Sequence, residues 1–289
     1  MNGDLQMGMA ATKLRPPASP TRLVRRPRLR DLLNDGVAEA VSLLLVSAPA
    51  GSGKSTLIAA WALEADRPVA WLQVEASDSD PASFWSSLVA AIGRCRPEVA
   101  AVVGPVVIGA QGDDRVVVPA IVNAFVDVSE PLVVVIDDYH LIDSDSVHRG
   151  LERLIDLCPA QLTFVVSTRV DPPFRLGRMR VRNRLSEVRA EHLRFDSDEA
   201  TALLGSAADA LSARRVDDLC SRTEGWAAGL VLAGLSLERA ADPDQFVDAF
   251  RGDDQLVAGY LSDELLDAMS AGDRQRLLET AVLDHLTGP

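Results

Sequence analysis

Apolar and polar positions alternate in two distinct ways along the first two thirds of this chain. Short, continuous apolar runs predict buried strands, and segments with helical spacing separate them. The runs are Val41–Val46, Pro68–Val74, Leu132–Ile136 and Leu162–Val166. The predicted helices are a short one ending near Gly36, Ser55–Ala65, one from Pro81 to about Ile92, and Val116–Val128. The pattern predicts an α/β fold, with helices on both faces of a parallel sheet.

Beyond residue 195 only helical patterns remain. Asp196, followed by Glu199, has the spacing of a capping box and predicts a helix start. Further helices are predicted near Arg214–Thr223, Ala227–Ala240, Phe246–Phe250, Leu256–Met269 and Arg274–Val282. Residues 1–20 are polar and rich in proline, which predicts a flexible leader. The chain stops directly after an apolar helix, so we expect the parent protein to be longer.

The composition is typical of a globular protein, with 47% hydrophobic and 25% charged residues. The apolar run Ile121–Val128 is interrupted by polar residues and is far shorter than the roughly 18 residues of a membrane span. The first residues lack the pattern of a secretory signal. Cys95, Cys158 and Cys220 form no CxxC pair, which favours reduced thiols. We therefore expect a cytoplasmic protein without a membrane partner.

The net charge of −13 opposes general attraction to nucleic acid. The segment Arg169–Arg184 nevertheless holds six arginines and one acid. Four interpretations remain open for it: a DNA or RNA contact, an arginine presented to another subunit, a solvated face, or a compositional preference for arginine throughout the chain. We favour the compositional preference, because only Lys13 and Lys54 of the 29 basic residues are lysines. We therefore expect no sequence-specific nucleic-acid binding by this chain.

The segment between the first apolar run and the next helix has the pattern of a phosphate-binding loop. It reads Ala48-Pro49-Ala50-Gly51-Ser52-Gly53-Lys54-Ser55-Thr56. Glycines let backbone N–H groups approach phosphate oxygens, and the positive end of the following helix adds attraction. Lys54 is predicted to reach the β- and γ-phosphates of ATP, and Ser55 to place its hydroxyl on Mg²⁺. Ala48 stands where the usual pattern has its first glycine. This replacement is unfavourable only if the backbone at that position needs a positive φ.

Two further predicted strands end in polar residues. The third is followed by Asp137, predicted to bind Mg²⁺ directly or through water, and by Asp138, predicted to orient or deprotonate the attacking water. The fourth is followed by Ser167-Thr168-Arg169. Arg169 is predicted to sense the γ-phosphate, and the alternative is a solvent-facing arginine. The predicted catalytic residues are therefore Lys54, Asp138 and Arg169.

These motifs and their flanks resemble the N-terminal ATPase module of MalT-like, LuxR-type transcriptional regulators. That group belongs to the signal-transduction ATPases with numerous domains (STAND), relatives of the AAA-type and NB-ARC nucleotide switches. The resemblance covers nearly the whole chain, and its Asp-Asp-Tyr-His and Gly-Trp strings are more specific than the phosphate loop. The matching segments are Thr12–Leu14, Val24–Leu29, Ala70–Leu72, Asp137–Ile142, Ser167–Arg169, Leu193–Phe195 and Thr223–Leu230.

The resemblance implies four parts: a leader (1–22), a P-loop nucleotide-binding domain (23–195), a helical domain (196–250) and the beginning of a truncated winged-helix domain (251–289). It implies ATP or ADP with Mg²⁺ as ligands. Val24 and Arg26 would sit near the adenine, and Gly225 and Ala227 would approach it from the helical domain. Relatives often carry proline where Ala227 stands, a difference that bears on affinity for the base.

The resemblance further implies a regulatory switch with slow, signal-gated ATP hydrolysis, in which ATP favours an open or self-associating form. Inducer and DNA would bind to C-terminal regions that lie outside this chain. A ring-forming AAA+ motor is one alternative, although it more usually has glutamate where Asp138 stands. A small-molecule P-loop kinase is another. A third is the regulatory ATPase module of a serine/threonine kinase, although no kinase signature appears in this sequence.

Overall fold

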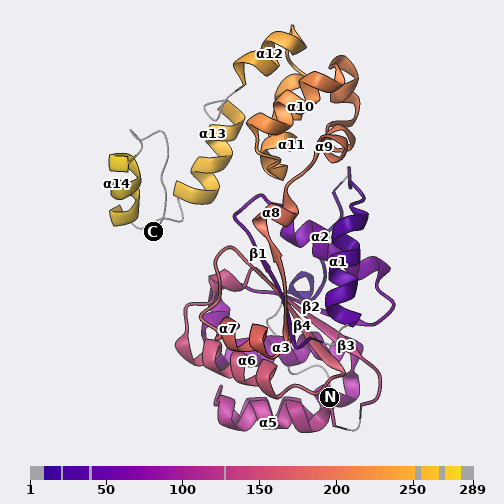
Figure 1. Cartoon of the computed structure of the whole chain (residues 1–289). Coiled ribbons are helices and arrows are strands. Elements are labelled where there is room, and N and C mark those ends of the chain that lie inside the picture. Colours follow the sequence, from indigo (N-terminus) through magenta and orange to yellow (C-terminus); the bar gives the residue numbers. More distant parts are fainter. Residues whose placement is uncertain are drawn as a thin grey trace. The chain divides into compact units, whose positions relative to one another are not determined.

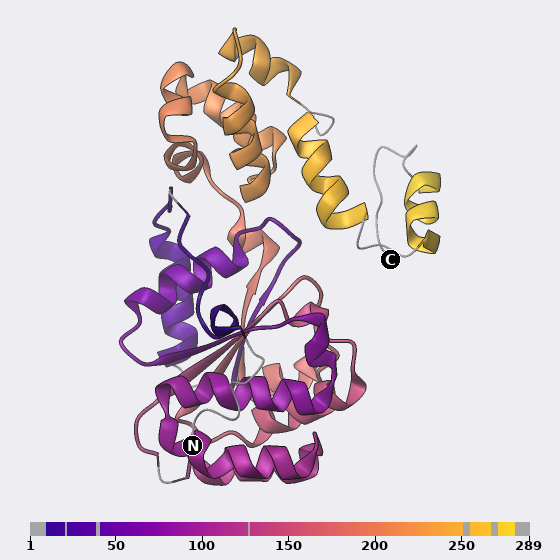
Figure 2. The same ribbon diagram turned by 180° about the vertical axis from the view of Figure 1, so that it is seen from behind.

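A computed structural model of the chain describes residues 10–20, 22–38, 41–126, 128–250, 255–266 and 271–280. The chain divides into two compact units, Met1–Arg194 and Phe195–Pro289, which we describe separately. Figures 1 and 2 show the ribbon from opposite sides. Among the described helices, none has the length and apolar character needed to cross a membrane.

The first unit is built on a five-stranded parallel sheet in the order β2-β3-β4-β1-β5. Its strands are β1 (Leu43–Ser47), β2 (Val69–Gln73), β3 (Leu132–Asp137), β4 (Leu162–Thr168) and β5 (Leu185–Arg189). Every residue of β1, β3 and β4 is buried, which explains their continuous apolar sequences. The first four strands coincide with the predicted apolar runs. The edge strand β5 was not predicted, because Val188 alone of its five residues is fully buried.

Alternate residues of each strand face opposite sides of the sheet, and helices cover both sides (Figure 1). Leu44 and Val46 of β1 belong to one core, together with residues of α1 and α2. Leu43 and Leu45 belong to the other, together with residues of α3 to α7. The helices are α1 (Pro27–Ala38), α2 (Lys54–Glu64), α3 (Pro81–Cys95), α4 (Pro97–Ala110), α5 (Asp114–Ala124), α6 (Asp145–Leu157), α7 (Leu176–Val181) and α8 (Ala190–Leu193). The predicted α/β fold is therefore confirmed.

Four helices of this unit were not predicted, namely α4, α6 and the short helices α7 and α8. In α4 nearly every position is apolar, so its sequence shows no clear helical spacing. In α6 the spacing is present, because Val147, Leu151, Leu154 and Ile155 are buried on one side. Helix α5 was predicted over Val116–Val128, but it begins at Asp114 after the capping side chain of Asp113.

The prediction of a flexible leader over residues 1–22 is wrong for residues 11–14. These residues form a 3-10 helix, η1 (Ala11–Leu14), in which Lys13 and Leu14 are buried. The Lys13 ammonium lies 2.7 Å from the Asp78 carboxylate, which is fully buried and also accepts a hydrogen bond from Ser87. A buried carboxylate needs a charged partner, and Lys13 supplies it. This ion pair fixes the leader beside the end of β2.

The second unit is helical. Its helices are α9 (Ser197–Leu204), α10 (Ala213–Arg222), α11 (Ala227–Leu237), α12 (Pro243–Ala249), α13 (Gln255–Leu261) and α14 (Ala271–Thr280), with a π-helical turn at Ser262–Leu266. The Asp196 carboxylate accepts the Glu199 amide at 2.8 Å, which confirms the predicted capping box. The beginning of a winged-helix domain at 251–289 stays a prediction, because residues 251–254, 267–270 and 281–289 lie outside the described residues.

Candidate nucleotide-binding site

The predicted phosphate loop joins the end of β1 to the start of α2. Gly51 and Gly53 have φ values of 69° and 84°, a conformation that glycine adopts without strain. Helix α2 begins at Lys54, directly after Gly53 as its N-cap residue. Ala48 is buried and is not among the described residues with positive φ. Alanine therefore fits where the usual pattern has glycine.

The Lys54 side chain is buried within this loop. Its ammonium donates hydrogen bonds to the carbonyl oxygens of Ala48, at 2.8 Å, and Pro49, at 3.0 Å. The side chain thus curls back over the loop that the glycines shape. A phosphate group bound in the loop would compete with these carbonyls for the ammonium.

Ser55 and Asp137 are brought together from α2 and β3. The Ser55 hydroxyl donates to Oδ1 of Asp137 at 2.9 Å, and Oδ2 is buried without a hydrogen-bond partner among the described residues. Burial raises the pKa of Asp137, and the neighbouring Asp138 charge raises it further, while the nearby hydroxyls of Ser167 and Ser55 oppose both. Hydroxyl and carboxylate oxygens are ligands that Mg²⁺ prefers. These two residues therefore fit the predicted metal site.

Asp138 is held by a residue that the sequence analysis missed. Gln73, the last residue of β2, donates from Nε2 to Oδ2 of Asp138 at 2.6 Å. Asp138 has a φ of 56°, which turns the chain sharply as it leaves β3. Gln73 is a polar residue at the end of an apolar strand, the same signal that identified Asp137 and Arg169. That signal could have found it.

Arg169 directly follows β4, which lies between β1 and β3 in the sheet. The ends of parallel strands meet at one edge of a sheet, so Arg169 begins its loop between the phosphate loop and Asp137. Arg169 is half-buried. The structure therefore gathers the three predicted catalytic residues, Lys54, Asp138 and Arg169, at the same edge.

The residues predicted to surround the adenine fall in both units. Arg26 donates to the carbonyl oxygens of Leu193, at 3.0 Å, and Arg194, at 2.7 Å, while Val24 is half-buried two residues before it. In the second unit, Gly225 has a φ of 67°, and Ala227 is the first residue of α11. Their convergence on one base stays a prediction.

Much of the arginine-rich segment is used inside the first unit. Arg175 pairs with Glu152, and Arg180 pairs with Glu187. Arg184 donates to the carbonyl oxygens of Ile155 and Asp156 near the end of α6. These contacts leave fewer arginines than the sequence suggested for binding nucleic acid.

Comparison with known proteins identifies a family domain within the chain. Residues 24–166 match the AAA ATPase domain family. The chain is 35% identical over 284 residues to the serine/threonine-protein kinase PknK of Mycobacterium tuberculosis, covering 96% of this chain and 25% of the kinase. It is 32% identical over 283 residues to the HTH-type transcriptional regulator MalT of Yersinia enterocolitica, covering 94% of this chain and 30% of the regulator. The chain thus spans less than a third of these relatives' length.

A solved structure supports the fold. The Walker-type ATPase paby2304 of Pyrococcus abyssi superimposes with a TM-score of 0.55 at 13% identity, covering 93% of this chain and 79% of that one. At such low identity the likeness concerns the fold alone. The family match over residues 24–166 shows that this chain carries there a domain of the AAA ATPase family.

Proposed function

We propose that this chain is an ATP-binding switch module of a larger signalling protein, of the STAND kind. The observation that carries the proposal is the 2.9 Å contact between Ser55 and Asp137, beside a buried Asp137 oxygen without a described partner. Residues 50–56 would bind ATP or ADP, and Ser55 and Asp137 would hold Mg²⁺. When bound, Mg²⁺ neutralises charge that develops on the transferred phosphoryl group.

The remaining residues support hydrolysis. Lys54 would hold the β- and γ-phosphates, and Asp138 would orient or deprotonate the attacking water, with Gln73 fixing its carboxylate. Arg169 would sense the γ-phosphate. We propose that turnover is slow and gated by a signal, because a switch acts through the different affinities of its two states for nucleotide.

The relatives suggest two settings for such a module. We favour the MalT-like one, a cytoplasmic transcriptional regulator whose inducer and DNA contacts lie outside this chain and whose ATP-bound form self-associates. The regulatory ATPase module of a serine/threonine kinase is the second candidate, and the 35% identity to PknK favours it. The ATP site is the same in both, so its test does not depend on the choice.

The first test of the proposal is Lys54→Ala, with Mg²⁺-ATP binding measured by calorimetry. Loss of a buried ammonium that faces phosphate should weaken binding by about two orders of magnitude or more. Arg149→Ala, on the exposed side of α6, removes the same charge elsewhere and should bind like wild type. Unchanged affinity in Lys54→Ala would remove the basis of the proposed function.

A further inference from the structure

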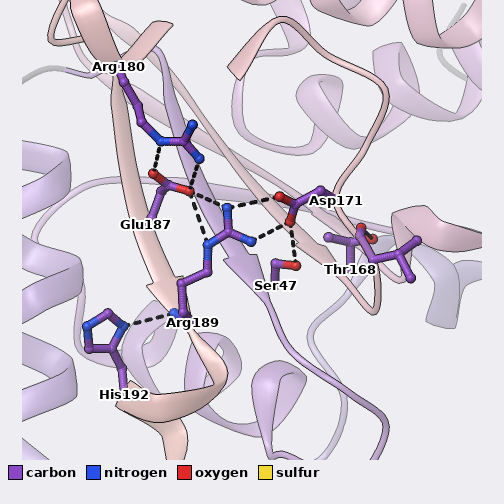
Figure 3. Close-up of polar contacts among 8 residues, drawn as sticks. Ser47, Thr168, Asp171, Arg180, Glu187, Arg189 and His192 are labelled. Carbon is purple, nitrogen blue, oxygen red and sulfur yellow. Dashed lines mark hydrogen bonds and ion pairs between the residues drawn. The ribbon is translucent and has the colours of Figure 1, made fainter. Parts of the chain in front are cut away.

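A second polar cluster lies at the same sheet edge, on the β5 side of the phosphate loop (Figure 3). Ser47, the last residue of β1, is paired with Arg189, the last residue of β5. Asp171 bridges them. It accepts the Ser47 hydroxyl at 2.9 Å, and both its oxygens receive hydrogen bonds from the Arg189 guanidinium. The base of the phosphate loop is thereby bonded to β5 through a side chain that belongs to neither strand.

The Arg189 guanidinium is held from a second direction by Glu187. That carboxylate also accepts two hydrogen bonds from Arg180, at 2.6 and 2.9 Å. Two carboxylates and two guanidinium groups therefore alternate across the end of β5, as Figure 3 shows. The neighbouring arginines lower the pKa of both Asp171 and Glu187. Charge pairs arranged as a network hold their geometry better than an isolated surface pair.

From Arg189 the contacts continue to the end of the first unit. The Arg189 amide donates to Nδ1 of His192 at 2.9 Å, and Arg28 donates to the His192 carbonyl at the same distance. Arg26 then binds the carbonyl oxygens of Leu193 and Arg194, after which the second unit begins. The peptide groups at the junction are thus fixed by side chains from the beginning of the chain.

The chain is also fixed just beyond this junction. Phe195 donates its amide to the carbonyl of Gly225 at 2.9 Å within the second unit. Each of these hydrogen bonds lies within one unit, so the backbone groups on either side of the boundary have partners in their own unit.

The other end of the path reaches the phosphate-binding lysine. Ser47 precedes Ala48, whose carbonyl accepts a hydrogen bond from Lys54 at 2.8 Å. Phosphate oxygens in the loop would compete for that ammonium. Binding of phosphate would therefore weaken the hydrogen bond that the Ala48 carbonyl accepts. Contacts of 3.1 Å or less then lead through Ser47, Asp171 and Arg189 to His192.

We propose that Asp171 and Arg189 are positioning residues that couple occupancy of the phosphate loop to the backbone of the junction at residues 192–195. This inference rests on the proposed function, because it needs a nucleotide in the loop. It adds a route by which nucleotide binding at the loop changes the backbone at the end of the first unit. A contiguous path carries a signal only if both of its ends respond, so the test reads both ends.

The experiment compares hydrogen exchange at residues 192–195 of the whole 289-residue chain with and without saturating Mg²⁺-ADP. Calorimetry measures Mg²⁺-ADP affinity in parallel. In the wild type, nucleotide should slow exchange at the junction by about fivefold or more, as expected for an ordinary coupling between sites. In Asp171→Asn and Arg189→Lys most of this difference should vanish, while affinity changes less than about threefold.

Two further variants keep the test decisive. Arg175→Lys is the matched control for Arg189→Lys, because Arg175 also binds a carboxylate through two nitrogens but lies outside the path. This variant should behave like wild type. Ser47→Ala deletes a single hydroxyl and leaves the Asp171–Arg189 ion pair in place, so it tests the path if the charge variants fail to fold. It should lose at least half of the nucleotide effect.

The possible outcomes separate the two proposals. Wild-type protection in Asp171→Asn, Arg189→Lys and Ser47→Ala overturns the coupling and leaves the nucleotide site intact. Equal loss in Arg175→Lys also overturns it, because the junction then reports general loosening of the unit. A wild type that binds no Mg²⁺-ADP overturns the proposed function itself.

Discussion

Acidic residues lie at two places along the same edge of the sheet, after β3 and beside β5, in opposite electrostatic settings. At the end of β3, Asp137 is buried, contacts a hydroxyl and an amide, and keeps one oxygen without a partner among the described residues. At the end of β5, Asp171 and Glu187 are partly exposed and bonded to arginines. The environment at β3 raises the pKa of Asp137, and the environment at β5 lowers the pKa of Asp171 and of Glu187.

This difference separates a ligand site from a structural network. Burying a carboxylate without a cation lowers the stability of the folded chain. Such a carboxylate is typical of a functional site, where a bound cation offsets that loss. A carboxylate that is bonded to a guanidinium group has its charge already balanced and offers little to a ligand. The contrast predicts opposite results when the same substitution is made at each end.

The largest effect is expected for Asp138→Asn, next to the buried acid. If Asp138 activates water, its loss should lower ATP turnover by about 100-fold or more and leave ATP affinity nearly unchanged. Phosphate release measures the first and calorimetry the second. Unaltered turnover would show that another group activates the water. Wild-type turnover of many per second would favour a motor over a switch.

Asp137→Asn should separate function from stability. Removing the charge should abolish the Mg²⁺ dependence of ATP binding, because the amide is a poor replacement for a carboxylate ligand. The melting temperature of the nucleotide-free chain should stay the same or rise, because an unfavourably buried charge is gone. Calorimetry with and without Mg²⁺, and thermal unfolding, provide the readouts. Lower stability with intact Mg²⁺ dependence would reverse the assignment.

Glu187→Gln should show the opposite pattern. It weakens contacts to Arg180 and Arg189, and for partly exposed pairs the loss in free energy of unfolding should be about 0.5–1 kcal/mol. Nucleotide affinity should not change. Urea unfolding compares it with Glu191→Gln, which changes an exposed acid two residues after Arg189. A loss of binding instead would place the β5 cluster in the ligand site.

The smallest expected effect is on the pH dependence of the free energy of unfolding. Asp137 and the pair Asp171 and Glu187 should contribute to it with opposite signs. The stability that Asp171 and Glu187 contribute is present above their unfolded pKa of about 4, and it is lost as pH falls through their lowered folded pKa. Asp137 has a raised pKa, so its protonation on lowering the pH from neutral favours the folded state. Urea unfolding between pH 3 and pH 7 should therefore show a shallower acid loss in Glu187→Gln and a steeper one in Asp137→Asn.

The sequence predicts the elements whose signal is local. The central strands are buried on both sides, and their apolar runs reveal them without further information. The phosphate loop and Asp137 each follow such a run, so their meeting at one sheet edge was predictable. In the structure they meet through the 2.9 Å hydrogen bond between Ser55 and Asp137.

What the sequence missed depends on partners far along the chain. Gln73 gains a role because Asp138, 65 residues away, reaches it. Lys13 looked like part of a flexible leader because its partner, Asp78, is another 65 residues distant. Strand β5 exists because β1 offers it an edge, and its own half-polar sequence gives little sign of it.

The two lysines have a practical consequence. Lys13 and Lys54 are the chain's full complement of lysine side chains, and each is only 7% exposed. An amine-reactive label therefore meets two buried lysine side chains, one holding the leader and the other inside the phosphate loop. Acylation of Lys54, resolved by peptide mass, would report how often the loop releases its ammonium. Acylation of Lys13 would record, in the same sample, how often the leader detaches from the sheet.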